Sequence, residues 1–167
     1  MNNTRRLTTL SITIAVAMVL SYLESQSPVF IAIPGIKIGL ANIAVIFALY
    51  KFGAKEAIMI SGIRVALISL LFGNTATFIY SIAGAASSLV LMIILKRFTP
   101  LHTVAISVVG GVMHNVAQIA VAGIMLRTGV LIYYLPFLLL SGIIAGIVVG
   151  IAGALLVERI KIDLSKR

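Results

Sequence analysis

The sequence has 167 residues, of which 61% are hydrophobic and 10% charged, and its mean hydropathy is +1.20. A soluble domain is about half apolar and about a quarter charged, so this chain has more apolar surface than one soluble core can bury. The lack of cysteine excludes disulfides, thiolate metal sites and cysteine nucleophiles, and the net charge of +9 comes with no nucleic-acid-binding motif. We therefore predict an integral membrane protein.

The apolar runs are continuous rather than alternating, which favours helices over the strands of a membrane barrel. The first run follows Arg5 and Arg6 and reaches Leu23 with no small-residue cleavage site, so we expect a retained helix rather than a signal peptide. The expected helices cover residues 7–23, 36–50, 57–72, 75–95, 102–126 and 131–157. The second and third are shorter than the roughly 20 residues of a spanning helix, which implies tilt or wider boundaries. The predicted fold is a single all-α domain, a bundle of six transmembrane helices.

The basic residues predict the orientation of this bundle. If the N-terminus is cytoplasmic, only Lys37 and Arg127 lie outside, and Arg64 lies within a helix. The other ten basic residues then lie in cytoplasmic segments: Arg5, Arg6, Lys51, Lys55, Lys96, Arg97, Arg159, Lys161, Lys166 and Arg167. Lys and Arg are retained on the cytoplasmic side during insertion. The split therefore favours six spans with both termini cytoplasmic, in a bacterial inner membrane.

Small residues at a spacing of four allow helices to approach closely in lipid. The last expected helix has one such row: Gly142, Gly146, Gly150 and Ala154. The first helix has two adjacent rows: Thr9, Thr13, Ala17 and Ser21, and beside them Ser11 and Ala15. For the last helix the pattern favours packing inside the bundle. For the first helix it raises the possibility that Ser11, Thr13, Ala15 and Ala17 dock a partner membrane subunit.

Arg64 is the clearest polar residue at membrane depth, where an arginine costs about 2.5–3.5 kcal/mol on insertion scales. The chain has four acidic residues: Glu24, Glu56, Glu158 and Asp163. The expected topology places the last three on the cytoplasmic side and Glu24 near the outer surface. Three partners for Arg64 are thus open: an anionic group of a ligand, an acidic residue of the chain, or a carbonyl oxygen.

The helix over 102–126 carries His114, Asn115 and Gln118 within about one turn, and His114 and Gln118 share a face. Hydrogen bonding to a ligand and ordinary helix packing both remain open for them. A metal site is disfavoured because cysteine is absent and His102 belongs to the opposite end of the helix. Asn74 falls at the expected external turn before residue 75.

The helix over 36–50 begins near Lys37, and its free N–H groups and dipole favour an anion there. Asn42 lies about 7.5 Å deeper at 1.5 Å per residue. We expect seven residues to converge on a ligand: Lys37, Asn42, Arg64, Asn74, His114, Asn115 and Gln118. The apolar segment 24–35 before this helix is either a lid over the site or an interfacial segment.

Several catalytic motifs are missing from the sequence. There is no GxxxxGK[ST] loop, so any ATP is bound by partner subunits. Prenyl transfer from a diphosphate normally needs clustered carboxylates for Mg²⁺, and the chain has a single aspartate, Asp163. We therefore expect a protein that is not itself an enzyme and carries no cofactor.

Four segments carry a resemblance to a known family: the run Pro34-Gly35-Ile36-Lys37-Ile38-Gly39-Leu40-Ala41-Asn42, then Arg64, then Leu71-Phe72-Gly73, then the run from Gly110 to Gln118. They resemble the Gx transporter family, also catalogued as heptaprenyl diphosphate synthase component I. That family is similar to the substrate-binding S components of energy-coupling factor (ECF) transporters. The resemblance implies a six-helix plasma-membrane protein that captures a vitamin-like ligand, such as a flavin or a quinone- or isoprenoid-related molecule. It also implies docking through the first helix on a transmembrane coupling subunit, with cytoplasmic ATPases. A non-catalytic component of heptaprenyl diphosphate synthesis and a membrane scaffold remain alternatives.

Overall fold

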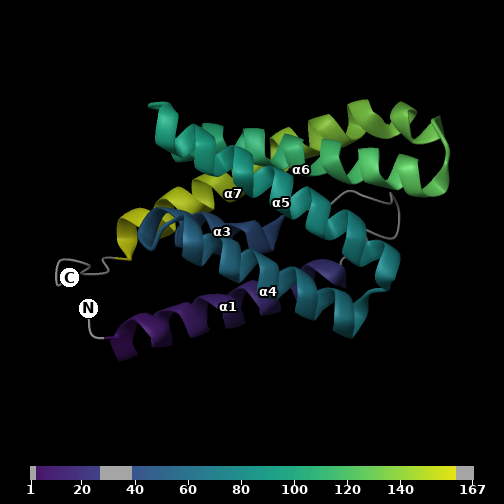
Figure 1. Cartoon of the computed structure of the whole chain (residues 1–167). Helices are drawn as coiled ribbons and strands as arrows, with labels where there is room; N and C mark the ends of the chain where they lie inside the picture. The colour runs from purple at the N-terminus through teal and green to yellow at the C-terminus, as the bar shows by residue number, and fades with distance from the viewer. Residues whose placement is uncertain (1–2, 27–38, 161–167) are drawn as a thin grey trace.

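The computed structural model describes residues 3–26 and 39–160, which form helices and no β-strand. The α-helices are α1 (Asn3–Ser25), α3 (Leu40–Lys51), α4 (Ala54–Phe72), α5 (Thr75–Phe98), α6 (Thr103–Leu126) and α7 (Leu135–Arg159), and Val130–Tyr134 forms the 3-10 helix η1 (Figure 1). The predicted all-α fold is therefore confirmed for the described residues.

Four segments are helical, long and apolar enough to cross a membrane: Arg6–Ser25, Phe78–Phe98, Thr103–Leu126 and Val130–Arg159. Their outer surfaces carry large apolar side chains such as Leu7, Ile124 and Tyr133, whose exposed fractions are 64%, 77% and 77%. Soluble monomers rarely expose contiguous apolar surface of this kind. The composition and the fold therefore both describe a membrane protein. The sixfold span count stays a prediction.

Three expected helix boundaries need correction. The helix expected to begin at residue 36 begins at Leu40, because Gly39 has a left-handed backbone with φ of 77°. The last helix begins at Leu135 rather than 131, because the preceding residues form η1 and Pro136 lies in its first turn, where proline favours a helix start. The third begins three residues earlier than expected, at Ala54, and Glu56 in its first turn complements the helix dipole.

The short helix α3 is the most deeply buried of the six. Its 12 residues extend about 18 Å at 1.5 Å per residue, which is less than the roughly 30 Å of a hydrocarbon core. Seven of them are buried: Ala41, Ala44, Val45, Ile46, Phe47, Ala48 and Leu49. Such burial on all sides is typical of a helix inside a bundle, so the other helices shield α3 from lipid.

The six described α-helices form a closed ring, and α3 also contacts α4 across it. Going around it, α1 contacts α3, α3 contacts α7, α7 contacts α6, α6 contacts α5, α5 contacts α4, and α4 returns to α1. The most extensive contacts are those of α6 with α7 and with α5. Both pairs are joined by short connections, so neighbours in sequence pack as antiparallel hairpins (Figure 1).

Glycines allow α6 and α7 to approach closely. A Cβ atom added to Gly146 would lie 2.5 Å from the Cα atom of Val108, and one added to Gly150 would lie 2.8 Å from the Cα atom of Val104. Across the same contact, a Cβ atom on Gly111 would lie 2.6 Å from the carbonyl oxygen of Gly142. The predicted packing role of the glycine row is confirmed at these positions.

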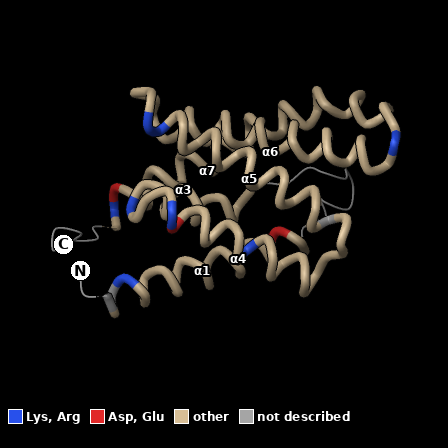
Figure 2. Tube along the Cα trace, viewed as in Figure 1, with Lys and Arg blue, Asp and Glu red and all other residues tan. Residues whose placement is uncertain are grey.

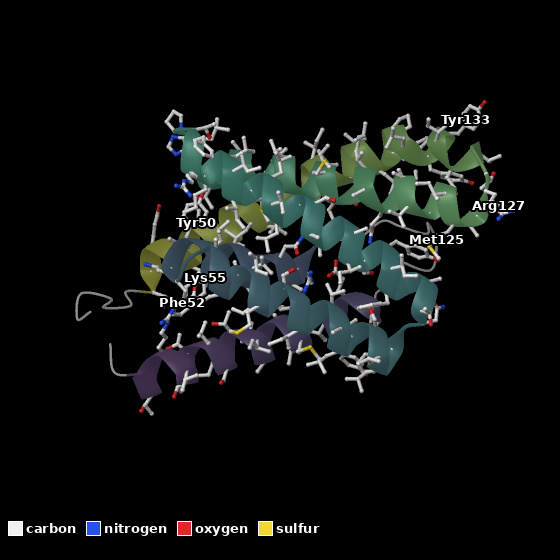
Figure 3. All side chains as sticks on the ribbon, in the orientation of Figure 1. Tyr50, Phe52, Lys55, Met125, Arg127 and Tyr133 are labelled. Carbon is white, nitrogen blue, oxygen red and sulfur yellow. The ribbon has the colours of Figure 1, made fainter. Side chains whose placement is uncertain are left out.

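Most charged residues lie at one end of the bundle. Figure 2 shows most of the blue basic positions gathered at the end where α1 begins and α7 ends. In Figure 3, Lys55 lies at that end and Arg127 at the opposite end. Arg6 forms an ion pair with Glu56 and thereby joins α1 to α4 there, and the Lys96 ammonium donates to the Leu49 carbonyl oxygen at 2.5 Å.

This asymmetry makes the orientation testable with single cysteines, since the chain has no native thiol. We expect Arg127→Cys to react with a membrane-impermeant maleimide in intact cells, and Lys55→Cys to react only after the membrane is opened. Both positions are exposed, so reaction of both in opened membranes controls for reactivity. Labelling of Lys55→Cys in intact cells would contradict a cytoplasmic location for the two termini.

Candidate functional site

A cavity of about 290 Å³ lies inside the ring, and all six helices contribute to its lining. Most of its polar side chains are hydroxyls, amides and an imidazole: Ser21, Ser25, Asn42, Ser69, Ser81, Ser88, Ser107, His114 and Asn115. Its charged lining residues are Glu24 and Arg64, and its apolar part includes Val65, Ile68, Phe72 and Val149. Ligand pockets are commonly about 300–1,000 Å³ and mostly apolar with a few convergent polar groups. The cavity therefore suits a small, partly polar molecule.

The cavity lies beside the N-terminal end of α3. Gly39 and Asn42 line the cavity from this end. The N-terminal half of α3, through Asn42 and Ile46, thus forms part of the cavity wall.

Arg64 is 8% exposed and reaches the cavity from the middle of α4. Ala57, Ile60 and Ser61 are also buried, so Arg64 continues the inward face of the helix at the usual spacing of three and four. Its Nη2 atom donates to Oδ1 of Asn42 at 3.3 Å. Its Nε atom is buried and has no hydrogen-bond partner among the described residues. Arg64 therefore faces the interior of the bundle and lies beside Asn42.

Glu24 is a cavity residue that the sequence reasoning did not include. It was expected near the outer surface, but its side chain is only 7% exposed at the end of α1. Its carboxylate accepts a hydrogen bond from the backbone N–H of Gly39 and interacts electrostatically with Arg64. The available signal was the buried face of α1, where Leu10, Thr13, Ala17 and Ser21 precede Glu24 at spacings of three and four.

This contact changes the expected role of the α3 N-terminus. The sequence assigned the anion-binding end of this helix to a ligand, but the carboxylate of Glu24 bonds to Gly39 immediately before it. A carboxylate is stabilised at a helix N-terminus by the dipole and the free N–H groups. The chain itself therefore supplies an anion to this position. Lys37, expected at the same place, lies outside the described residues.

His114 and Asn115 both line the cavity from α6, as predicted. Asn115 is 5% exposed, and its Nδ2 atom donates to the Leu138 carbonyl oxygen at 2.6 Å and contacts Oγ of Ser141 at 3.4 Å. The side-chain amide thus holds α6 against α7 at the edge of the cavity. For Asn115 the packing interpretation gains direct support, and its side chain shapes one wall of the site.

Two other predicted site residues do not line the cavity. Gln118 packs on α5 instead, since a Cβ atom on Gly84 would lie 2.7 Å from its Cγ atom. It shares a helical face with His114 but lies one turn farther along α6, beyond the cavity. Asn74 is exposed in the turn between α4 and α5.

The segment 24–35 is described only as far as Gln26, so its proposed function as a lid lies outside the described residues.

The two small-residue rows of α1 point in different directions. Thr13 and Ala17 are buried in the bundle, with exposed fractions of 6% and 0%, and the Thr13 hydroxyl bonds to the Thr9 carbonyl oxygen. Ser11 and Ala15 are exposed. The expected docking surface is therefore wrong for Thr13 and Ala17, because α1 uses this row to contact α3 and α4.

The ring and its interior cavity define a class: a helical membrane protein with a small internal cavity of mixed apolar and polar lining. Within that class, the chain belongs to the heptaprenyl diphosphate synthase component I family, whose model matches residues 13–156. The match includes the described cavity residues and confirms the family resemblance drawn from the sequence. No curated protein and no solved structure matches the chain.

Proposed function

We propose that this protein captures a small molecule in the membrane, as the substrate-binding subunit of an ECF-type transporter. The observation that carries the proposal is Arg64, whose guanidinium lines an interior cavity with its Nε atom unpartnered among the described residues. Buried donors are normally satisfied, and intramembrane charges usually mark functional sites. A ligand acceptor group in the cavity would supply the hydrogen bond that Nε lacks.

Transport would require partner subunits. The sequence has no P-loop, so we assign ATP hydrolysis to cytoplasmic ATPases and the transmission of motion to a transmembrane coupling subunit. The exposed face of α1 with Ser11 and Ala15 is the surface that we assign to the coupling subunit. Small residues there would allow close helix approach. The cargo would be vitamin-like, with flavins and quinone- or isoprenoid-related molecules as candidates, and the chain itself would catalyse no reaction.

The family's name favours a second candidate, a non-catalytic membrane component of heptaprenyl diphosphate synthesis. In that case the soluble partner would supply the metal-binding carboxylates. Among the described cavity residues Glu24 is the sole carboxylate, whereas Mg²⁺ sites for diphosphates usually use several oxygen ligands. We therefore rank this candidate second.

The experiment that separates these functions is purification from native membranes in mild detergent, followed by mass spectrometry of bound molecules and co-purified proteins. We expect about one small molecule per chain and the ATPases together with their coupling subunit. Prenyl product made by the purified chain with Mg²⁺ and a soluble partner would instead support the second candidate. Recovery of lipid alone, with no ATPase, would indicate a scaffold and contradict the capture function.

A further inference from the structure

The charges of the cavity suggest what kind of molecule it binds. Among the described lining residues, Glu24 and Arg64 are the charged side chains, so their formal charges cancel when His114 is neutral. They come from α1 and α4 and interact electrostatically. Each hydrogen-bonds to a different group, Glu24 to the backbone of Gly39 and Arg64 to Asn42.

Both side chains retain hydrogen-bonding capacity. A guanidinium has five N–H donors, and here Nη2 bonds to Asn42 while the buried Nε atom has no partner among the described residues. A carboxylate has two acceptor oxygens, and among the described residues that of Glu24 accepts one hydrogen bond, at Oε1. The Oγ atom of Ser21, one turn before Glu24, is also buried without a partner in the described part of the chain. The cavity therefore offers donors on its α4 side and an acceptor on its α1 side.

We infer that the ligand has no net charge and presents two complementary groups. One is an acceptor, a carboxylate or a carbonyl, which binds Arg64. The other is a donor, an ammonium or a ring N–H, which binds Glu24. This inference rests on the proposed capture function and narrows its ligand, replacing the anion expected from the sequence. An unpaired buried charge is strongly unfavourable, so a matched pair of ligand groups satisfies a pair of opposite wall charges better than one anion does.

A phosphorylated ligand would fit this cavity poorly. A phosphate monoester carries about −1.5 to −2 charges at pH 7. One of these would be matched by Arg64, and the remainder would lie near the carboxylate of Glu24 at low dielectric, where like charges repel strongly. Binding sites commonly reject a competing molecule by leaving one of its charges unpaired, and Glu24 would act in this way on a phosphorylated ligand.

Glu24→Gln tests the inference, because the affinity for the ligand should fall if Glu24 binds a donor group and should rise if the ligand is an anion. The glutamine carbonyl oxygen can still accept the hydrogen bond from Gly39, so the connection between α1 and α3 is retained. The matched control is Glu56→Gln, which changes the same chemical group at the charged end of the bundle, outside the cavity. The probe is the small molecule released by solvent from the wild-type protein, repurified and added back to stripped wild-type and variant protein in detergent.

If the inference is right, Glu24→Gln weakens binding of this molecule at least tenfold, Glu56→Gln leaves it unchanged, and the molecule shows no net charge on ion exchange at pH 7. Tighter or unchanged binding by Glu24→Gln, or a molecule retained as an anion, would overturn the inference and leave the capture function standing. If the wild-type protein releases no small molecule, the capture function fails and the inference fails with it. Melting temperatures in detergent identify any loss of affinity that comes from unfolding.

Discussion

Arg64→Ala is expected to lower the affinity for the bound small molecule by about 100-fold. Each charge-assisted hydrogen bond is worth about 1.5–3 kcal/mol, and 1.4 kcal/mol corresponds to a tenfold change in affinity. Among the described residues that line the cavity, Arg64 is the sole lysine or arginine, so no other cationic side chain of this set can replace it. Isothermal titration or a fluorescence competition assay on detergent-solubilised protein measures this change.

The same substitution should affect stability much less than binding. Removing a buried arginine saves its insertion cost of about 2.5–3.5 kcal/mol, but it takes from the carboxylate of Glu24 the cation with which it interacts among the described residues. These effects oppose each other, so we expect a small decrease in melting temperature that Glu24→Gln reverses in the double variant. Binding should stay weak in that double variant.

The control for Arg64→Ala is Arg6→Ala, which removes an arginine from the ion pair with Glu56 at the charged end of the bundle. The side chain of Arg6 is 51% exposed, and exposed ion pairs contribute about 0–1 kcal/mol, so neither affinity nor stability should change much. If Arg64→Ala bound as tightly as Arg6→Ala, the assignment of Arg64 to the ligand site would be wrong.

Gly146→Ala is expected to destabilise the bundle by roughly 1–3 kcal/mol, the usual cost of overpacking a well-packed contact. The added Cβ atom would lie 2.5 Å from the Cα atom of Val108 and 3.0 Å from the carbonyl oxygen of Ser107. Both are backbone atoms of α6, so relief requires the two helices to separate rather than one side chain to rotate.

Gly62→Ala is the matched control for this prediction. Gly62 lies in α4, where no described atom beyond the local helix backbone comes within 4 Å of an added Cβ, and alanine favours a helix by about 0.5–1 kcal/mol over glycine. Thermal unfolding in one detergent should therefore show a lower melting temperature for Gly146→Ala and an unchanged or higher one for Gly62→Ala. A Gly146→Ala variant as stable as the Gly62→Ala variant would show that the close approach of α6 and α7 is not required.

The packing of α6 on α7 and the cavity are physically linked. Gly142 and Gly146 line the cavity, and Asn115 joins α6 to the Leu138 carbonyl of α7 beside it. If α7 moves away from α6, the positions of His114 and Asn115 must change. For this reason Gly146→Ala should weaken ligand binding as well, although less than Arg64→Ala does, because it leaves both wall charges in place.

The sequence by itself determined the features that depend on composition and on helical period. Continuous apolar runs require helices in lipid, whatever their neighbours, and the expected helices match the observed ones within a few residues. The cost of a charge at membrane depth required Arg64 to face inward, and the structure places it there. The row with Gly142 and Gly146 likewise predicted a close helix contact, because small side chains at a spacing of four leave a continuous groove.

Tertiary structure alone decided which of the polar residues meet. Periodicity shows which face of a helix a residue occupies, but not how deep it lies or which helix covers it. That is why Gln118, on the same face as His114, packs on Gly84 beyond the cavity, and why Thr13 and Ala17 are covered by α3 and α4. Glu24 becomes part of the site because the chain brings Gly39 back to it, 15 residues later. Such a contact depends on how the ring of helices closes, which no local pattern in the sequence encodes.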